Sequence, residues 1–251
     1  MPDCIESKTE FGRCPSAVSE LFLLGTVHCD PKGFSRTRLF LERYRPGLIL
    51  VEISEFALKF RKQHSCSLRK TFVDRVRAVS KKLKIEFGKA MKHPQISSIL
   101  RQIIIPFEYR ASAAYAGKTG TELVIVDHSE FSREWIEKTW PEMMSISNIE
   151  KLLQLESAEQ SIPSLYRRAW KRIREGPSLP EKTPADMLRR QERENLISQK
   201  IISALEPFSM EKAVYIGGWW HLSSGGSVKT IRELLGIGLD SCGLLDREID
   251  A

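Results

Sequence analysis

Four short apolar runs along the chain predict buried β-strands. They are residues 21–27, 48–53, 122–127 and 213–217. A short, continuous apolar run is typical of a strand covered on both faces. Between the first two runs, turn residues at 30–33 precede a helical pattern over 35–44, which stops at Pro46-Gly47. Strand, helix and strand with short links predict a βαβ unit with parallel strands and a right-handed crossover.

Most of the remaining chain has helical patterns. The predicted helices are 68–91, 95–105, 108–118, 133–139, 149–160, 163–174, 184–205 and 228–235. The proline-rich segment 176–184 predicts a mobile surface loop. We expect a single α/β domain over residues 1–251, with its core at 21–235. Its central, mostly parallel sheet has four or more strands, and large helical insertions occupy 54–121 and 131–208.

The composition, with 41% hydrophobic and 28% charged residues, is typical of a globular protein. The longest apolar runs are far shorter than the roughly 20 residues of a membrane-spanning helix, and the first residues lack the pattern of a secretory signal. The five cysteines are scattered without a Cys-x-x-Cys pair, so we expect reduced thiols and a cytoplasmic protein. Cys29 is either a nucleophile or, more commonly for a single cysteine, a small packed residue.

The positive charge is concentrated in one stretch. The formal charge is +7, but residues 59–92 contain twelve Lys or Arg and only two acidic residues. Apolar residues recur there at spacings of three and four, which predicts an amphipathic helix with a basic outer face. That face is either simply solvated or a surface for an anionic partner such as nucleic acid, an acidic substrate or a lipid headgroup.

Polar residues follow the predicted strands where a ligand would bind in an α/β sheet. His28, Glu52, Asp127 and His221 each stand at the carboxyl end of one strand, and these ends line the ligand crevice of parallel sheets. Two imidazoles and a carboxylate suit a divalent metal with an open position for water, so His28, Glu52 and His221 are candidate ligands. Alternatively, Glu52 forms a structural salt bridge to a helix arginine.

Five short segments follow the order and rough spacing of one protein family. They are Gly25-Thr26-Val27-His28, Val51-Glu52, Pro106-Phe107-Glu108-Tyr109-Arg110-Ala111, Gln191-Glu192-Arg193-Glu194-Asn195 and Gly218-Trp219-Trp220-His221. Over residues 21–235 the chain thus resembles the TraB/PrgY and TIKI proteins, distant relatives of the erythromycin-esterase (EreA) and ChaN-like proteins. It departs from them at His128, where relatives often have arginine, and at the bulky Trp219 and Trp220. The hydrophobic C-terminal spans of several relatives are absent.

The resemblance implies an EreA/ChaN-like fold and two alternative functions. The TIKI relatives imply a metal-dependent, peptidase-like hydrolase acting on a peptide or a small amide or ester. His28, Glu52 and His221 would then bind a manganese, cobalt or zinc type of ion or activate water. The PrgY-like relatives imply a non-catalytic regulator that binds or sequesters a peptide pheromone. A metal site with an open water position would favour the first function, and a pocket sealed by Trp219 and Trp220 the second.

Three further residues receive catalytic roles through the resemblance. Glu108 is expected to support a ligand or to act as general acid or base, and Arg193 to stabilise an anion or oxyanion. Asp127 is expected to orient a histidine. The structural alternative is that Glu108 and Arg193 form an ion pair between helices.

Overall fold

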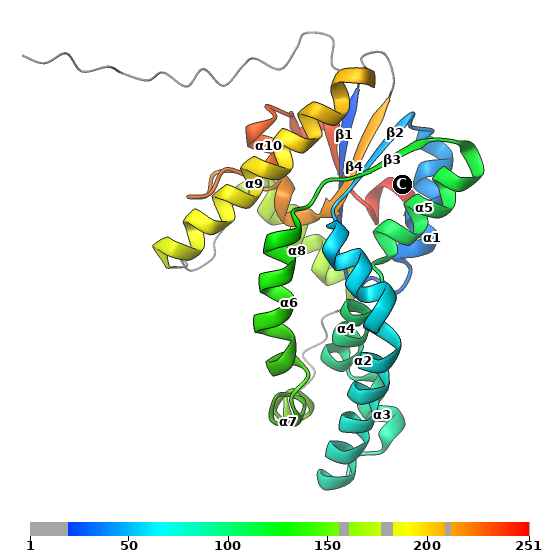
Figure 1. Cartoon of the computed structure of the whole chain (residues 1–251), viewed down its shortest axis with the longest axis vertical. Helices are drawn as coiled ribbons and strands as arrows, with labels where there is room; N and C mark the ends of the chain where they lie inside the picture. Colours follow the sequence, from blue (N-terminus) through cyan, green and yellow to red (C-terminus); the bar gives the residue numbers. More distant parts are fainter. Residues whose placement is uncertain (1–19, 156–160, 177–182, 209–211, 251) are drawn as a thin grey trace, which may run out of the picture.

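Five parallel strands form one sheet in the computed structural model, which describes residues 20–155, 161–176, 183–208 and 212–250 (Figure 1). The strands are β1 (Leu21–Thr26), β2 (Leu48–Val51), β3 (Glu122–Ile125), β4 (Ala213–Gly218) and β5 (Cys242–Leu244). Their order is β3-β2-β4-β1-β5, and all pairs are parallel. The α/β class and the four predicted strands are therefore confirmed. The three-residue edge strand β5 was not predicted.

The strand order brings the two Gly-x-x-His segments side by side. β1 and β2 are parallel, as the βαβ unit predicts, but β4 lies between them and pairs with both. Across β1 and β4, Gly25 pairs with Gly217 and Thr26 with Gly218. The second Gly-x-x-His, which begins at Gly218, is thus displaced by one residue relative to the first, which begins at Gly25. Since side chains alternate between the faces of a strand, equivalent positions of the two segments start on opposite faces.

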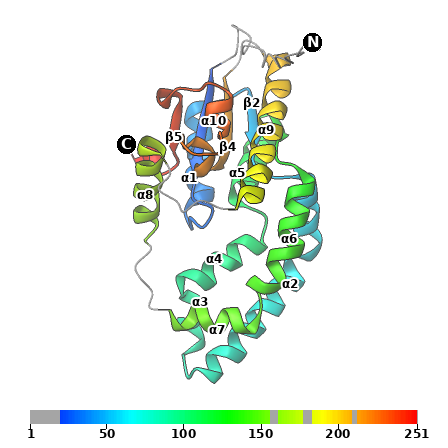
Figure 2. The same cartoon turned by 90° about the vertical axis from the view of Figure 1, so that its left-hand side faces the viewer.

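Helices cover both faces of the sheet and extend beyond one end of it (Figures 1 and 2). The α-helices are α1 (Gly33–Tyr44), α2 (Glu55–Lys82), α3 (Phe87–Lys92), α4 (Pro94–Ile103), α5 (Phe107–Thr119), α6 (Ser129–Met143), α7 (Ile146–Gln154), α8 (Ile162–Glu175), α9 (Pro184–Leu205), α10 (Ile231–Leu234) and α11 (Arg247–Asp250). The 3₁₀ turns are η1 (Glu206–Phe208), η2 (Trp219–Leu222) and η3 (Leu239–Ser241). In Figure 1 α1 and α5 lie on one face of the sheet and α9 and α10 on the other, while Figure 2 shows α8 beside the β5 edge. The predicted helical insertions correspond to α2–α5 and α6–α9.

The predicted helix 68–91 is wrong in its boundaries. Helix α2 starts at Glu55, because the Ser54 side chain accepts a hydrogen bond from the Ala57 backbone N–H and caps the helix directly after β2. It ends at Lys82, and Lys84, at φ 55°, separates it from α3. The periodic apolar residues of this stretch thus belong to two helices. Binding of an anionic partner to its basic face stays a prediction.

Two separate groups of buried residues hold the structure together. The larger packs around the sheet and includes every buried strand residue from Leu48 to Val51. The smaller joins α2, α3, α4 and α7 through residues such as Phe72, Ile96 and Ile149. These four helices and the far part of α6 project as an arm from the end of the sheet where the strands finish (Figures 1 and 2).

Several expectations fall outside the described residues. These are the N-terminal segment before residue 20, the end of the predicted helix 149–160 and most of the loop 176–184. Across the described ranges, no helix is both long and apolar enough to cross a membrane. Cys29, Cys66 and Cys242 are free thiols.

Candidate active site

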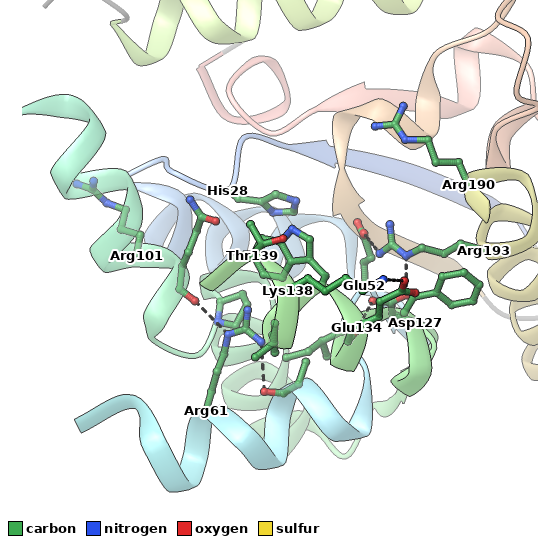
Figure 3. A pocket seen from close by; sticks show the side chains of 18 of the residues that line it. His28, Glu52, Arg61, Arg101, Asp127, Glu134, Lys138, Thr139, Arg190 and Arg193 are labelled. Atoms are coloured by element: carbon green, nitrogen blue, oxygen red, sulfur yellow. Dashed lines mark hydrogen bonds and ion pairs between the residues drawn. The ribbon is translucent and has the colours of Figure 1, made fainter. Parts of the chain in front are cut away.

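A cavity of about 730 Å³ opens at the carboxyl ends of the strands, where the arm meets the sheet. His28, Cys29, Glu52 and Asp127 line it from the strand ends. Helices α2, α4, α6 and α9 supply the other walls, including Arg61, Arg101, Lys138, Arg190 and Arg193 (Figure 3). Its size lies in the range of small-molecule sites. The cavity thus lies at the end of the sheet where the sequence predicts a ligand site.

His28 and Glu108 form a pair at this cavity. The imidazole Nδ1 lies 2.7 Å from Glu108 Oε1, and the His28 side chain is 56% exposed while that of Glu108 is buried. Because an ionised carboxylate only accepts hydrogen bonds, Nδ1 carries the proton and donates it. The Thr26 hydroxyl lies 2.7 Å from the same Glu108 oxygen and 3.0 Å from the Gly217 carbonyl. The buried end of the pair is thus fixed, and the other edge of the ring faces the cavity.

Glu52 lies at the centre of an ion-pair network. Its Oε1 accepts from Arg193 Nη2 at 2.7 Å and lies 3.0 Å from His221 Nε2. Its Oε2 accepts from the Gly218 backbone N–H at 2.6 Å. Arg193 also donates from Nε to Asp127 Oδ1 at 2.9 Å. The salt bridge to a helix arginine, the structural alternative for Glu52, is therefore present, with Arg193 of α9 as its partner.

His221 is enclosed, unlike His28. Its side chain is 4% exposed, and its Nδ1 lies 2.8 Å from Glu194 Oε1 while Nε2 faces Glu52. Glu194 Oε2 also accepts from the Ile231 backbone N–H at 2.8 Å. Glu194 belongs to the family-like segment 191–195, but no role was predicted for it from the sequence. Its spacing to Ile197, Ile201 and Leu205 on α9 is the missed signal, because it places the carboxylate on the buried helix face.

The charges of this network shift the protonation of its members. Burial of His221 lowers its pKa, but the carboxylates of Glu194 and Glu52 outweigh burial and raise the pKa to about 10. Burial of Glu52 raises its pKa, yet His221 and then Arg193 hold that pKa well below its ordinary value. His221 is therefore an imidazolium between two carboxylates at neutral pH.

The pKa of His28 is raised for a related reason. Desolvation of the ring lowers this pKa, and the opposing effect of the Glu108 charge and hydrogen bond is larger. The His28 ring thus loses its proton at a higher pH than an ordinary histidine does.

The geometry corrects two assignments. Asp127 does not orient a histidine ring: it pairs with Arg193, and Glu108 and Glu194 are the carboxylates that hold the two histidines. Glu108 pairs with His28, and Arg193 pairs with Asp127 and Glu52, so Glu108 and Arg193 do not form an ion pair with each other.

The expected metal set of His28, Glu52 and His221 does not fit this arrangement. Both ring nitrogens of His221 face carboxylates, and an arginine occupies the Glu52 oxygen that a metal would need. Among the described residues, no group of three or more His, Cys, Asp or Glu side chains is placed to hold a metal ion.

The cavity lining shows where Cys29 and the two tryptophans, Trp219 and Trp220, lie relative to the candidate site. Cys29 lines the cavity, and burial raises the pKa of its thiol, which disfavours a thiolate nucleophile. Trp219 and Trp220 are not among the residues that line it, so they do not seal the pocket. The sealed pocket that would favour the sequestering function is therefore absent from the described residues.

Comparison of the chain with protein-family models, curated proteins and solved structures found no match in any of the three. The resemblance to the TraB/PrgY and TIKI proteins stays a prediction carried by the five short segments.

Proposed function

We propose that the protein is a hydrolase in which His28 activates water to cleave an amide, peptide or ester bond. The observation that carries the proposal is the His28–Glu108 pair, at 2.7 Å, with its imidazole exposed in a cavity and its carboxylate buried. A carboxylate that holds Nδ1–H leaves Nε2 of the neutral ring as a proton acceptor. Once its ring is deprotonated, His28 therefore has the tautomer and the location of a general base.

Arg193 supplies the second requirement, a stabilised oxyanion. Its Nε and one Nη2 hydrogen are bound to Asp127 and Glu52, and Nη1 has no hydrogen-bond partner among the described residues. The two carboxylates fix the guanidinium on the cavity wall, as Figure 3 shows. A fixed donor directed at the carbonyl oxygen stabilises the negative charge that develops as water attacks.

In this proposal His221, Glu194 and Glu52 position other groups and do not react. The buried imidazolium offsets one of the negative charges around it, so that Glu52 keeps both its charge and its contact with Arg193. The five family-like segments support the same assignment, because His28, Glu52, Glu108, Arg193 and His221 all come from them. An EreA/ChaN-like fold is part of the proposal.

The test is hydrolysis of a panel of short peptides, aryl amides and aryl esters by the wild type and by His28→Asn. Losing a general base lowers the rate about 10²- to 10⁴-fold. His64→Asn, an exposed histidine of α2 outside the cavity lining, is the matched control and should keep the wild-type rate. Equal rates for His28→Asn and wild type on every substrate cleaved would end the assignment.

A further inference from the structure

One end of the cavity contains arginine charge that no carboxylate of the described residues pairs with. Arg61, on α2, is 7% exposed, and its hydrogen bonds run to two backbone carbonyls, from Nε to Gln102 at 3.1 Å and from Nη1 to Ala57 at 3.2 Å. Its guanidinium also lies over the Trp140 ring, at 5.1 Å from the centroid. Carbonyls and a ring face orient the cation without neutralising it.

Arg101 lines the same cavity from α4. It is the neighbour of Gln102 on this helix, and within the described ranges it has no ion-pair partner. In the view of Figure 3, Arg61 and Arg101 lie toward one end of the cavity, with Glu52, Asp127 and Arg193 toward the other. Two helices thus bring two uncompensated guanidinium groups to the wall opposite the ion-pair network.

A buried cation without a counter-ion is costly. Desolvation lowers the pKa of Arg61 to about 10, which the more distant charge of Asp127 only partly opposes. Arg61 and Arg101 are therefore placed to gain from an incoming anion, and a guanidinium binds planar oxyanions through two parallel hydrogen bonds.

We infer that Arg61 and Arg101 form a subsite for a carboxylate of the substrate, such as the C-terminal carboxylate of a short peptide. The inference rests on the proposed function, since it places an anionic group beside the bond that His28 would hydrolyse. Four acidic side chains also line the cavity: Glu52, Asp127, Glu134 and Asp186. They disfavour a doubly charged phosphate more than a singly charged carboxylate.

The experiment is calorimetric titration of the full chain with N-acetyl-alanyl-alanine, its C-terminal amide and inorganic phosphate. We expect the wild type to bind the acid about tenfold or more tightly than the amide, as charge-assisted hydrogen bonds predict. Arg101→Gln should abolish this preference. Lys62→Gln, which removes an equal charge from the exposed face of α2 outside the cavity lining, should keep it.

Arg61→Gln should also abolish the preference, and thermal melting shows whether this buried substitution still folds. If it does not, Arg101→Gln, at a partly exposed position, still decides the question. The inference would be overturned by equal affinity for the acid and the amide, or by no saturable binding of any probe. It would also be overturned if Lys62→Gln lost the preference for the acid as fully as Arg101→Gln, or if phosphate bound more tightly than the acid. Preferential binding of the acid without hydrolysis would uphold the subsite and count against the proposed function. Hydrolysis without preferential binding of the acid would uphold the proposed function and count against the subsite.

Discussion

The two Gly-x-x-His segments stand side by side in the sheet, yet their histidines have opposite environments. His28 has one carboxylate partner and an exposed ring, whereas His221 is enclosed between Glu52 and Glu194. Two structural differences separate them. The segments are displaced by one residue across β1 and β4. The 3₁₀ turn η2 folds His221 inward, whereas His28 lies in the turn that the Asp30 N–H closes on the Val27 carbonyl at 2.8 Å. Similar sequences thus produce one group suited to proton transfer and one suited to holding charge.

Glu52→Gln should have the largest effect on stability. The change leaves Arg193 with Asp127 alone and removes one of the two charges that hold protonated His221. Breaking a buried ion pair on one side costs about 3–5 kcal/mol of the free energy of unfolding. Urea unfolding measures it, with Glu122→Gln as control, since Glu122 is exposed at the opposite end of the sheet. A Glu52→Gln protein as stable as the control would show that the network around His221 is not structural.

The pH dependence of stability should be smaller over any single pH unit. Because the pKa of His221 is about 10 when folded and near 6.5 when unfolded, the native state keeps a proton that the unfolded chain loses between these values. Its contribution to stability is complete below pH 6.5 and falls by up to about 1.4 kcal/mol per pH unit as the pH rises toward 10. Glu52, whose pKa is lowered, contributes above about pH 4.5 and loses this contribution in acid.

Unfolding curves collected across this pH range test the prediction. In His221→Gln the slope between pH 6.5 and 10 should flatten. In His28→Asn most of that slope should remain, because His221 and its two carboxylate partners are unchanged. The same slope in the wild type and in His221→Gln would contradict the assignment of a buried imidazolium.

Glu108→Gln should have the smallest effect, a displaced pH profile of activity. Catalysis by His28 requires the neutral ring, so the acidic limb of the wild-type profile should lie above pH 6.5. Glu108 is the main group that raises the pKa of His28, so its neutral analogue should move the limb to lower pH. If the acidic limb of the pH profile stays at the same pH in Glu108→Gln, the deprotonation of His28 does not control the rate. Glu122→Gln again serves as control.

The sequence predicted the strand ends well because continuous apolar runs identify buried strands on their own. His28, Glu52, Asp127 and His221 follow such runs, so their convergence needed only the rule that carboxyl ends of parallel strands share an edge. The order of the strands could not be predicted, because no local sequence pattern indicates that β4 lies between β1 and β2. The edge strand β5, three residues long, gives too little pattern to detect.

The contributions of the helices were harder to predict. Arg61 belongs to the basic stretch 59–92, whose outer face was expected to be either solvated or a surface for an anionic partner. Arg61 is instead buried against α4 and Trp140. Glu194 and Arg193 are adjacent on α9 but serve two different parts of the network. Such roles depend on how helices from separate insertions pack, and a single sequence records only which face of each helix is apolar.

The separation of the two groups of buried side chains has a consequence for how the molecule opens. The cluster formed by α2, α3, α4 and α7 shares few contacts with the sheet, so it can behave as a cooperative unit of its own. Amide hydrogen exchange in the outer turns of α2 and in α7 should then occur through partial openings that leave the five strands protected. Because α2 begins directly at the end of β2, each opening would widen the entrance to the cavity while His28 and its neighbours stay in place.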